Sequence, residues 1–232
     1  MACILLLETS TTVCSVALSV DGNVVFDKVS FEGPSHAALL GMFVEEAIAF
    51  SKENNYQPDA VAISGGPGSY TGLRIGTSMA KGLCMGWGIP LIAIPTLDIM
   101  AAKAIRNTDD NDSLYCAMLD ARRMEVYASV YDATLAVIRE TAADIVTSET
   151  YYPFLEKGKM YFFGNGAAKC KEIIASENAI FLEDIHPLAA EMALLAEQAY
   201  EAKHFEDVAY YAPFYLKDFI ATVPKNKVLG EF

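Results

Sequence analysis

The chain has 232 residues, of which 53% are hydrophobic and 20% charged, and its formal net charge is −13. This composition is typical of a folded globular protein with room for one large or two small domains, and it excludes an intrinsically disordered chain. The acidic balance excludes strong nucleic-acid binding by the chain alone, because affinity for a phosphate backbone depends largely on lysine and arginine.

No apolar stretch approaches the roughly 20 residues of a membrane-spanning helix, and the first residues lack the basic and small-residue features of a signal peptide. The five cysteines are scattered and include no C-x-x-C pair. Buried free thiols in a reducing compartment are the expectation for such cysteines. We therefore predict a cytoplasmic protein that does not contact a membrane.

The first part of the chain alternates predicted strands and helices. The predicted strands are Cys3–Glu8 and residues 13–20, 24–31, 59–64 and 90–94, with a tight turn at residues 21–23. The predicted helices run from a candidate N-cap at Ser35 to about residue 53, over residues 71–87, and up to about Arg106.

A polar stretch at residues 107–113 predicts a linker, after which the pattern restarts. The next predicted elements are strands at Leu114–Asp120, Glu125–Tyr131 and residues 135–140, a helix, a strand at residues 160–164, a second helix, and an alanine-rich helix at residues 188–203. We divide the chain into a first α/β domain at residues 1–106 and a second at residues 107–232 with a C-terminal helix and tail.

The two halves share one order of features. Each begins with a strand that ends in an acidic residue, Glu8 or Asp120, followed by a polar turn, a second strand and a turn at Asp21 or Asp132. This order predicts two copies of a mixed α/β domain. It is typical of the actin, Hsp70 and sugar-kinase type of fold, a duplicated ribonuclease-H-like architecture in which each first hairpin offers its turn to nucleotide phosphates.

The glycine-rich stretch SGGPGSYTGLRIG, residues 64–76, follows a predicted strand and precedes a helix. Its spacing matches neither G-x-x-x-x-G-K-[ST] nor G-x-G-x-x-G, although a helix N-terminus there could still accept an anion. The candidate nucleotide or anion site consists of Thr9, Ser10, Thr11, Gly65 and Gly66, with ATP or ADP as possible ligands at a partner interface. The alternative is a Ser/Thr-rich turn that only caps strand ends.

Two helices carry signs of a partner interface. Small residues recur every fourth position after the glycine-rich stretch, and a helical glycine costs roughly 1 kcal/mol relative to alanine unless close approach of another helix compensates. The preceding helix is apolar over roughly 180° of its surface, which fits either an interface or deep burial in one domain. The predicted interface consists of Leu40, Met42, Val44, Gly72, Arg74, Gly76, Met79 and Ala80.

Five segments, LLLETSTTVCSVAL, SGGPGSYTGLRIGTSMAKGL, IPTLDIMA, LDARRMEVYAS and YYAPFYLKDF, together resemble the TsaB (YeaZ) family. These are bacterial partner proteins in the threonylcarbamoyl-adenosine (t6A) modification of tRNA. The resemblance covers nearly the whole chain and implies the two-domain fold and a homodimer when alone, formed through the first domain at residues 1–106. It also implies a complex with a TsaD-type catalytic paralogue and a TsaE-type ATPase. It also implies that tRNA is contacted only indirectly.

At two positions this chain differs from the TsaD-type paralogue. TsaD-type proteins bind a metal through H-x-x-x-H, and Thr96 and Met100 stand at those histidine positions. Neither suits a hard or borderline divalent ion, so we expect no metal and a non-catalytic scaffold. Asp120, Arg122 and Arg123 match the family's second turn, where the arginines either pair internally or meet a partner's carboxylates.

Two other functions remain open. An independent kinase or ATPase of the same fold would need bound magnesium near Glu8 and Asp120. A peptidase is ranked last, because the three histidines, His36, His186 and His204, are dispersed and form no recognisable Ser/His/Asp arrangement.

Overall fold

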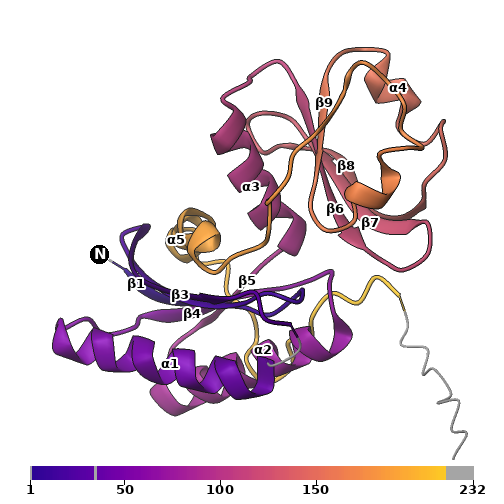
Figure 1. The fold of residues 1–232 in the computed structure, drawn as a ribbon. Coiled ribbons are helices and arrows are strands. Elements are labelled where there is room, and N and C mark those ends of the chain that lie inside the picture. Colours follow the sequence, from indigo (N-terminus) through magenta and orange to yellow (C-terminus); the bar gives the residue numbers. More distant parts are fainter. Residues whose placement is uncertain (1, 34–35, 218–232) are drawn as a thin grey trace, which may run out of the picture.

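A computed structural model describes residues 2–33 and 36–217, which form two units, each built on a five-stranded sheet (Figure 1). The first sheet has the order β3-β2-β1-β4-β5, with strands β1 (Cys3–Glu8), β2 (Cys14–Val20), β3 (Asn23–Ser30), β4 (Ala60–Ser64) and β5 (Leu91–Ile94). The second has the order β10-β9-β6-β7-β8, with strands β6 (Leu114–Asp120), β7 (Glu125–Tyr131), β8 (Val137–Ile145), β9 (Met160–Phe163) and β10 (Ala179–Phe181).

The two sheets repeat one pairing scheme. The leading strands β1 and β6 each pair antiparallel with the next strand, β2 or β7, and parallel with a later strand, β4 or β9. The first hairpin closes at Asp21 and Gly22, whose φ values of 48° and 71° give the left-handed turn that matches strand twist. The predicted duplicated α/β architecture is therefore confirmed.

Helices cover both faces of the first sheet (Figure 1). Leu5 and Leu7 of β1 pack with α1 (His36–Glu53) and α2 (Tyr70–Trp87), whereas Ile4 and Leu6 pack with α5 (Ala193–Glu201). Successive side chains of a strand point to opposite faces, so both sides of β1 are buried. This double burial explains why β1 is a continuous apolar run rather than an alternating one.

Two helices pack on a sheet away from their neighbours in the sequence. The helix α3 (Thr96–Thr108) follows β5 but buries Leu97, Met100 and Ala104 against the second sheet. The last helix, α5, follows the second sheet but packs on the first. This exchange joins the two units through buried apolar contacts.

Several predicted elements in the second half were wrong in extent or type. The helix expected after β9 is only a 3-10 turn at Ala168–Cys170, and β10 was not predicted. The third strand of this half extends to Ile145, the expected helix before β9 is the single turn α4 (Tyr152–Leu155), and the alanine-rich helix is shorter than predicted. Helix α3 ends at Thr108, inside the predicted linker.

Short elements with little periodicity explain most of these differences, because a three-residue strand carries too few residues to show alternation. The predicted N-cap Ser35 and the predicted tail beyond residue 217 lie outside the described residues. All five cysteines are free and buried, as expected. Within residues 2–33 and 36–217, no helix is both long and apolar enough to cross a membrane.

Candidate functional site

The first turn, defined as residues 9–13 between β1 and β2, is buried under the start of α2 except at Thr12, which is exposed. Thr9 and Ser10 are 2% and 1% exposed. The Thr9 hydroxyl donates a hydrogen bond to the Gly72 carbonyl oxygen at 2.8 Å, and the Ser69 N–H donates to the Ser10 carbonyl oxygen at 2.6 Å. Two polar groups of this turn are therefore bonded to the start of the chain's own helix, whereas the buried Ser10 hydroxyl has no partner among the described residues.

The helical glycines make this close contact possible. A methyl group at Gly72 would overlap the Thr9 carbonyl oxygen, and one at Gly76 would overlap the Thr9 hydroxyl oxygen. A Cβ at Gly68 would lie 2.5 Å from the Ser10 carbonyl oxygen. The element that approaches Gly72 and Gly76 so closely is thus the first turn of the same chain, whereas Gly82 and Gly86 in the same helix face open space.

This finding corrects five of the predicted interface residues, which lie inside the first unit and are unavailable to a partner. Gly72 and Gly76 are buried against the first turn. The other three, with exposed fractions of 1%, 4% and 0%, belong to the core cluster between the first sheet and its helices; they are Leu40, Val44 and Ala80.

The loop at Gly65 and Gly66 is covered as well. The Gly65 N–H donates to the Ile94 carbonyl oxygen at 2.7 Å, and the Phe214 N–H donates to the Gly65 carbonyl oxygen at 2.8 Å. A Cβ at Gly66 would lie 2.5 Å from the Phe214 carbonyl oxygen. Together with Thr9, Ser10 and Thr11, these glycines meet at the carboxyl ends of β1 and β4, but the bonded and covered backbone argues against an anion site there.

Glu8, the last residue of β1, is fully buried. Its Oε1 accepts a hydrogen bond from the Ser10 N–H at 2.5 Å, whereas its Oε2 has no partner among the described residues. Burial raises the pKa of Glu8 to about 7, although hydrogen bonds from Ser10 and Ser64 oppose this rise. A fully buried carboxyl that bonds to its own chain is shielded from the water that a bound magnesium ion usually keeps.

Thr96 and Met100, at the positions where the paralogue has histidines, are both completely buried. Met100 packs in the apolar core between α3 and the second sheet. The Thr96 N–H donates to the Gly66 carbonyl oxygen at 2.9 Å. The described residues contain no group of three or more His, Cys, Asp or Glu placed to hold a metal ion.

The second turn, defined as residues 121–124 between β6 and β7, differs from the first because it is held open. Its residues Arg122 and Arg123 are exposed and have φ values of 69° and 51°. The Lys169 ammonium donates hydrogen bonds to the carbonyl oxygens of Arg123 and Glu125 at 2.7 and 2.6 Å and forms an ion pair with Asp120. Lys169 therefore fixes the backbone of the turn from beneath.

The internal pairing considered for this turn is wrong, because Asp120 pairs with Lys169 and meets only the backbone N–H of Arg122. In the described part of the chain, neither arginine side chain has a hydrogen-bond or ion-pair partner. Asn165 also supports the turn, as its Oδ1 accepts the Asp120 N–H at 2.9 Å. The sequence did not predict that Asn165 and Lys169 support this turn, because only the pairing of β6 with β9 brings them under it.

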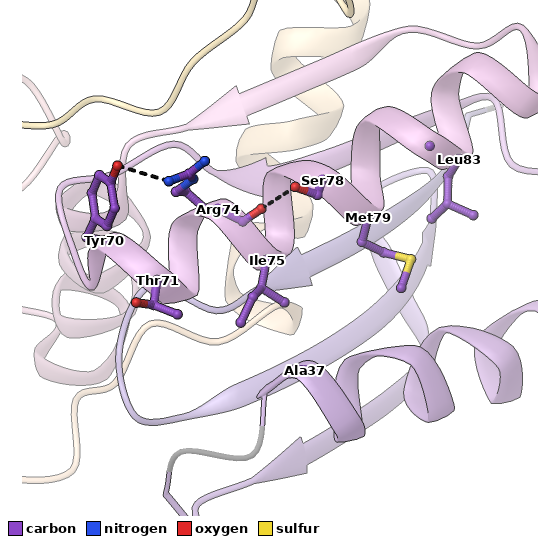
Figure 2. A pocket seen from close by; sticks show the side chains of 9 residues that line it. Ala37, Tyr70, Thr71, Arg74, Ile75, Ser78, Met79 and Leu83 are labelled. Carbon is purple, nitrogen blue, oxygen red and sulfur yellow. Dashed lines mark hydrogen bonds between the residues drawn. The ribbon is translucent and has the colours of Figure 1, made fainter.

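A groove of about 750 Å³ lies between the start of α1 and the outer side of α2 (Figure 2). Its lining residues are Ala37, Tyr70, Thr71, Arg74, Ile75, Ser78, Met79, Gly82 and Leu83. At one end, Arg74 donates a hydrogen bond to the Tyr70 hydroxyl at 3.0 Å, and the Tyr215 ring lies 5.0 Å from the Tyr70 ring.

The other three predicted interface residues are not enclosed in the core. Arg74 and Met79 line the groove, while Met42 on α1 is 54% exposed. Exposed apolar side chains continue towards the end of α2, where Met85 and Trp87 are 70% and 41% exposed. Exposed apolar side chains with an Arg and a Tyr beside them are typical of protein interfaces.

The chain is similar to several known proteins. A family model described as "TsaD: tRNA N6-adenosine threonylcarbamoyltransferase" matches residues 32–225. The "tRNA threonylcarbamoyladenosine biosynthesis protein TsaB" of Escherichia coli K12 is 31% identical over 228 residues, covering 94% of this chain and 96% of the relative. The protein of the same name from Bacillus subtilis is 26% identical over 222 residues, covering 92% and 93%.

A solved structure agrees with these relatives. The structure described as YeaZ from Pseudomonas aeruginosa superimposes with a TM-score of 0.80 at 25% identity, covering 93% of this chain and all of that one. The likeness extends over both units, which matches the duplicated architecture of the chain.

Proposed function

This chain belongs to the TsaB family and carries the domain that the TsaD family model describes, and on this premise we propose that it takes part in forming threonylcarbamoyladenosine in tRNA. In this proposal the chain is a non-catalytic subunit. It binds and activates a TsaD-type paralogue, works with a TsaE-type ATPase, and forms a homodimer when the paralogue is absent. The tRNA is held mainly by the paralogue, because this chain has a net charge of −13.

The groove between α1 and α2 is the observation that carries the proposal. The side chains of Ile75, Met79 and Leu83 are only partly buried there and line a cavity on one face of the first unit. Burying such apolar surface is the main favourable term in protein association. An Arg–Tyr pair at the rim, Arg74 and Tyr70, supplies the residue types that most often dominate binding energy.

A non-catalytic role is supported by the chemistry of two sites. The residues at the paralogue's histidine positions, Thr96 and Met100, are buried and poorly suited to divalent ions. Glu8, which an independent kinase of this fold would use near its magnesium, is buried with its pKa raised to about 7. Both features disfavour a metal-dependent reaction on this chain.

The test is a pair of mass determinations in solution, with the chain alone and then mixed with the TsaD-type protein of the same organism. We expect a homodimer that is replaced by a heterodimer. A monomer that ignores the paralogue, together with ATP turnover by the purified chain, would contradict the proposal and favour an independent kinase or ATPase.

Two variants test whether the groove is the interface with the paralogue. The double substitution Ile75→Glu with Met79→Glu puts two charges into the groove and should weaken the heterodimer by at least about 30-fold, or ~2 kcal/mol. The matched control is Ile138→Glu on β8, where the side chain is 49% exposed on the second unit. If the control weakens the complex and the groove variant does not, the interface lies on the second sheet instead.

A further inference from the structure

We propose that the second turn binds phosphate groups of the RNA on which the complex acts, through the guanidinium groups of Arg122 and Arg123. The inference rests on the proposed function, from which it takes the RNA. It adds one direct RNA contact to a chain whose net charge of −13 otherwise disfavours RNA, and it names the two side chains that make it.

The first step is that these two guanidinium groups are free. Every other arginine of the chain bonds to its own protein: Arg74 to Tyr70, Arg106 to Glu191 and Arg139 to Asp144. The chain has 30 acidic residues against 17 lysines and arginines, so a carboxylate partner is easily found. Two adjacent arginines left exposed without one, in the described chain, indicate a ligand that comes from outside.

The second step is the conformation of the turn. Both arginines are in the left-handed region, with φ values of 69° and 51°, which side chains other than Gly, Asn and Asp rarely adopt. The strain persists because Lys169 bonds to two carbonyl oxygens of the turn and to Asp120. Strain that the surrounding structure maintains at exposed charged residues is a feature of binding sites.

The third step is the position of the turn. Helices α1 and α2, which form the proposed protein interface, lie on the face of the first sheet that is turned away from the second unit (Figure 1). The second turn belongs to the β6–β7 hairpin of that second unit. A paralogue docked on the groove therefore leaves the two arginines available to another ligand.

The fourth step is the chemistry of the ligand. A guanidinium group matches phosphate with parallel hydrogen bonds, and its charge does not titrate in the physiological range. Phosphate contacts position a nucleic acid without reading its sequence. Because the chain as a whole repels RNA, such a contact is favourable only where positive side chains gather without acidic partners.

The test uses the complete heterodimer and unmodified tRNA, with fluorescence anisotropy measured over a series of salt concentrations. In Arg122→Gln with Arg123→Gln, we expect tRNA affinity to fall about 10- to 100-fold at low salt. The slope of log affinity against log salt should become shallower by about 1 to 2, one for each lost phosphate contact. The matched control, Lys157→Gln with Lys203→Gln, removes the same charge from two exposed lysines elsewhere.

Three results would overturn the inference. Unchanged affinity and slope would show that the arginines do not touch RNA, and an equal loss in the control would reduce the effect to overall charge. Loss of the heterodimer in the arginine variant would show that the turn contacts an acidic protein surface. Failure of the proposed function is seen separately and earlier, as wild-type proteins that do not assemble at all, and it would remove this inference as well.

Discussion

The two leading hairpins occupy equivalent places in equivalent sheets, yet one turn is sealed and the other is open. The first turn is buried under α2, which approaches it through Gly72 and Gly76. In the second turn, Arg122 and Arg123 are exposed. A duplicated backbone therefore does not imply a duplicated site.

The difference arises in the segment after the parallel strand that pairs with each hairpin, β4 or β9. In the first unit, an 18-residue helix, α2, comes after β4 and places its glycine side against the turn. In the second unit, the matching segment after β9 is a three-residue 3-10 turn, which instead places Lys169 beneath the hairpin. The same position in the fold is thus closed by a helix in one unit and supported by a single ammonium group in the other.

The largest expected effect comes from a substitution at Gly72, where α2 approaches the first turn. Gly72→Ala should lower the free energy of unfolding by about 3 kcal/mol, because the new methyl group meets the Thr9 carbonyl oxygen, which is backbone and cannot rotate away. The matched control is Gly82→Ala in the same helix, where a methyl group meets open space and should raise stability by up to about 1 kcal/mol. Urea unfolding measures both, and equal effects would show that the first turn is not sealed in this way.

The second prediction concerns how the free energy of unfolding depends on pH through Glu8, the buried residue that precedes the first turn. The pKa of Glu8 is raised from 4.5 to about 7, so the folded state binds more protons between these values, and the stabilising protonated form is lost as pH rises through 7. Glu8→Gln cannot lose a proton. Its stability relative to the wild type should therefore increase by on the order of 2–3 kcal/mol from about pH 5 to about pH 8.

The measurement for Glu8 is the free energy of unfolding of both proteins across that pH range. Other titrating groups are common to the two chains and cancel in the difference. A difference that does not change with pH would mean that the carboxyl group is hydrated in the folded protein and that the first turn is open to water.

The smallest expected effect concerns Lys169, which supports the second turn. Lys169→Gln removes the ammonium group that bonds to the carbonyl oxygens of Arg123 and Glu125, and it should cost about 1 kcal/mol, since the side chain is 24% exposed. Hydrogen exchange of the amides at residues 121–125 should become several-fold faster. Lys171→Gln, an exposed lysine two residues later, is the control and should leave that exchange unchanged.

Much of the architecture could be predicted from local patterns, most securely for the leading strands. The limits of β1, β6 and β7 were predicted to the residue, because long apolar runs and clear turn residues define them. The repeated order of strand, acidic residue and turn also predicted the duplication, which the two strand orders confirm. The site was predicted less well, since Leu40, Val44 and the helical glycines proved to be internal.

By itself, the sequence determined which segments are strands and helices, that the pattern occurs twice, and to which family the chain is similar. Only the tertiary structure decided which side of α2 faces inward and that Lys169 lies under a turn more than forty residues earlier in the chain. The physical reason is that periodicity identifies buried positions but not the element that buries them. A glycine that allows a turn of the same chain to approach closely looks the same in the sequence as one that allows a partner helix to approach.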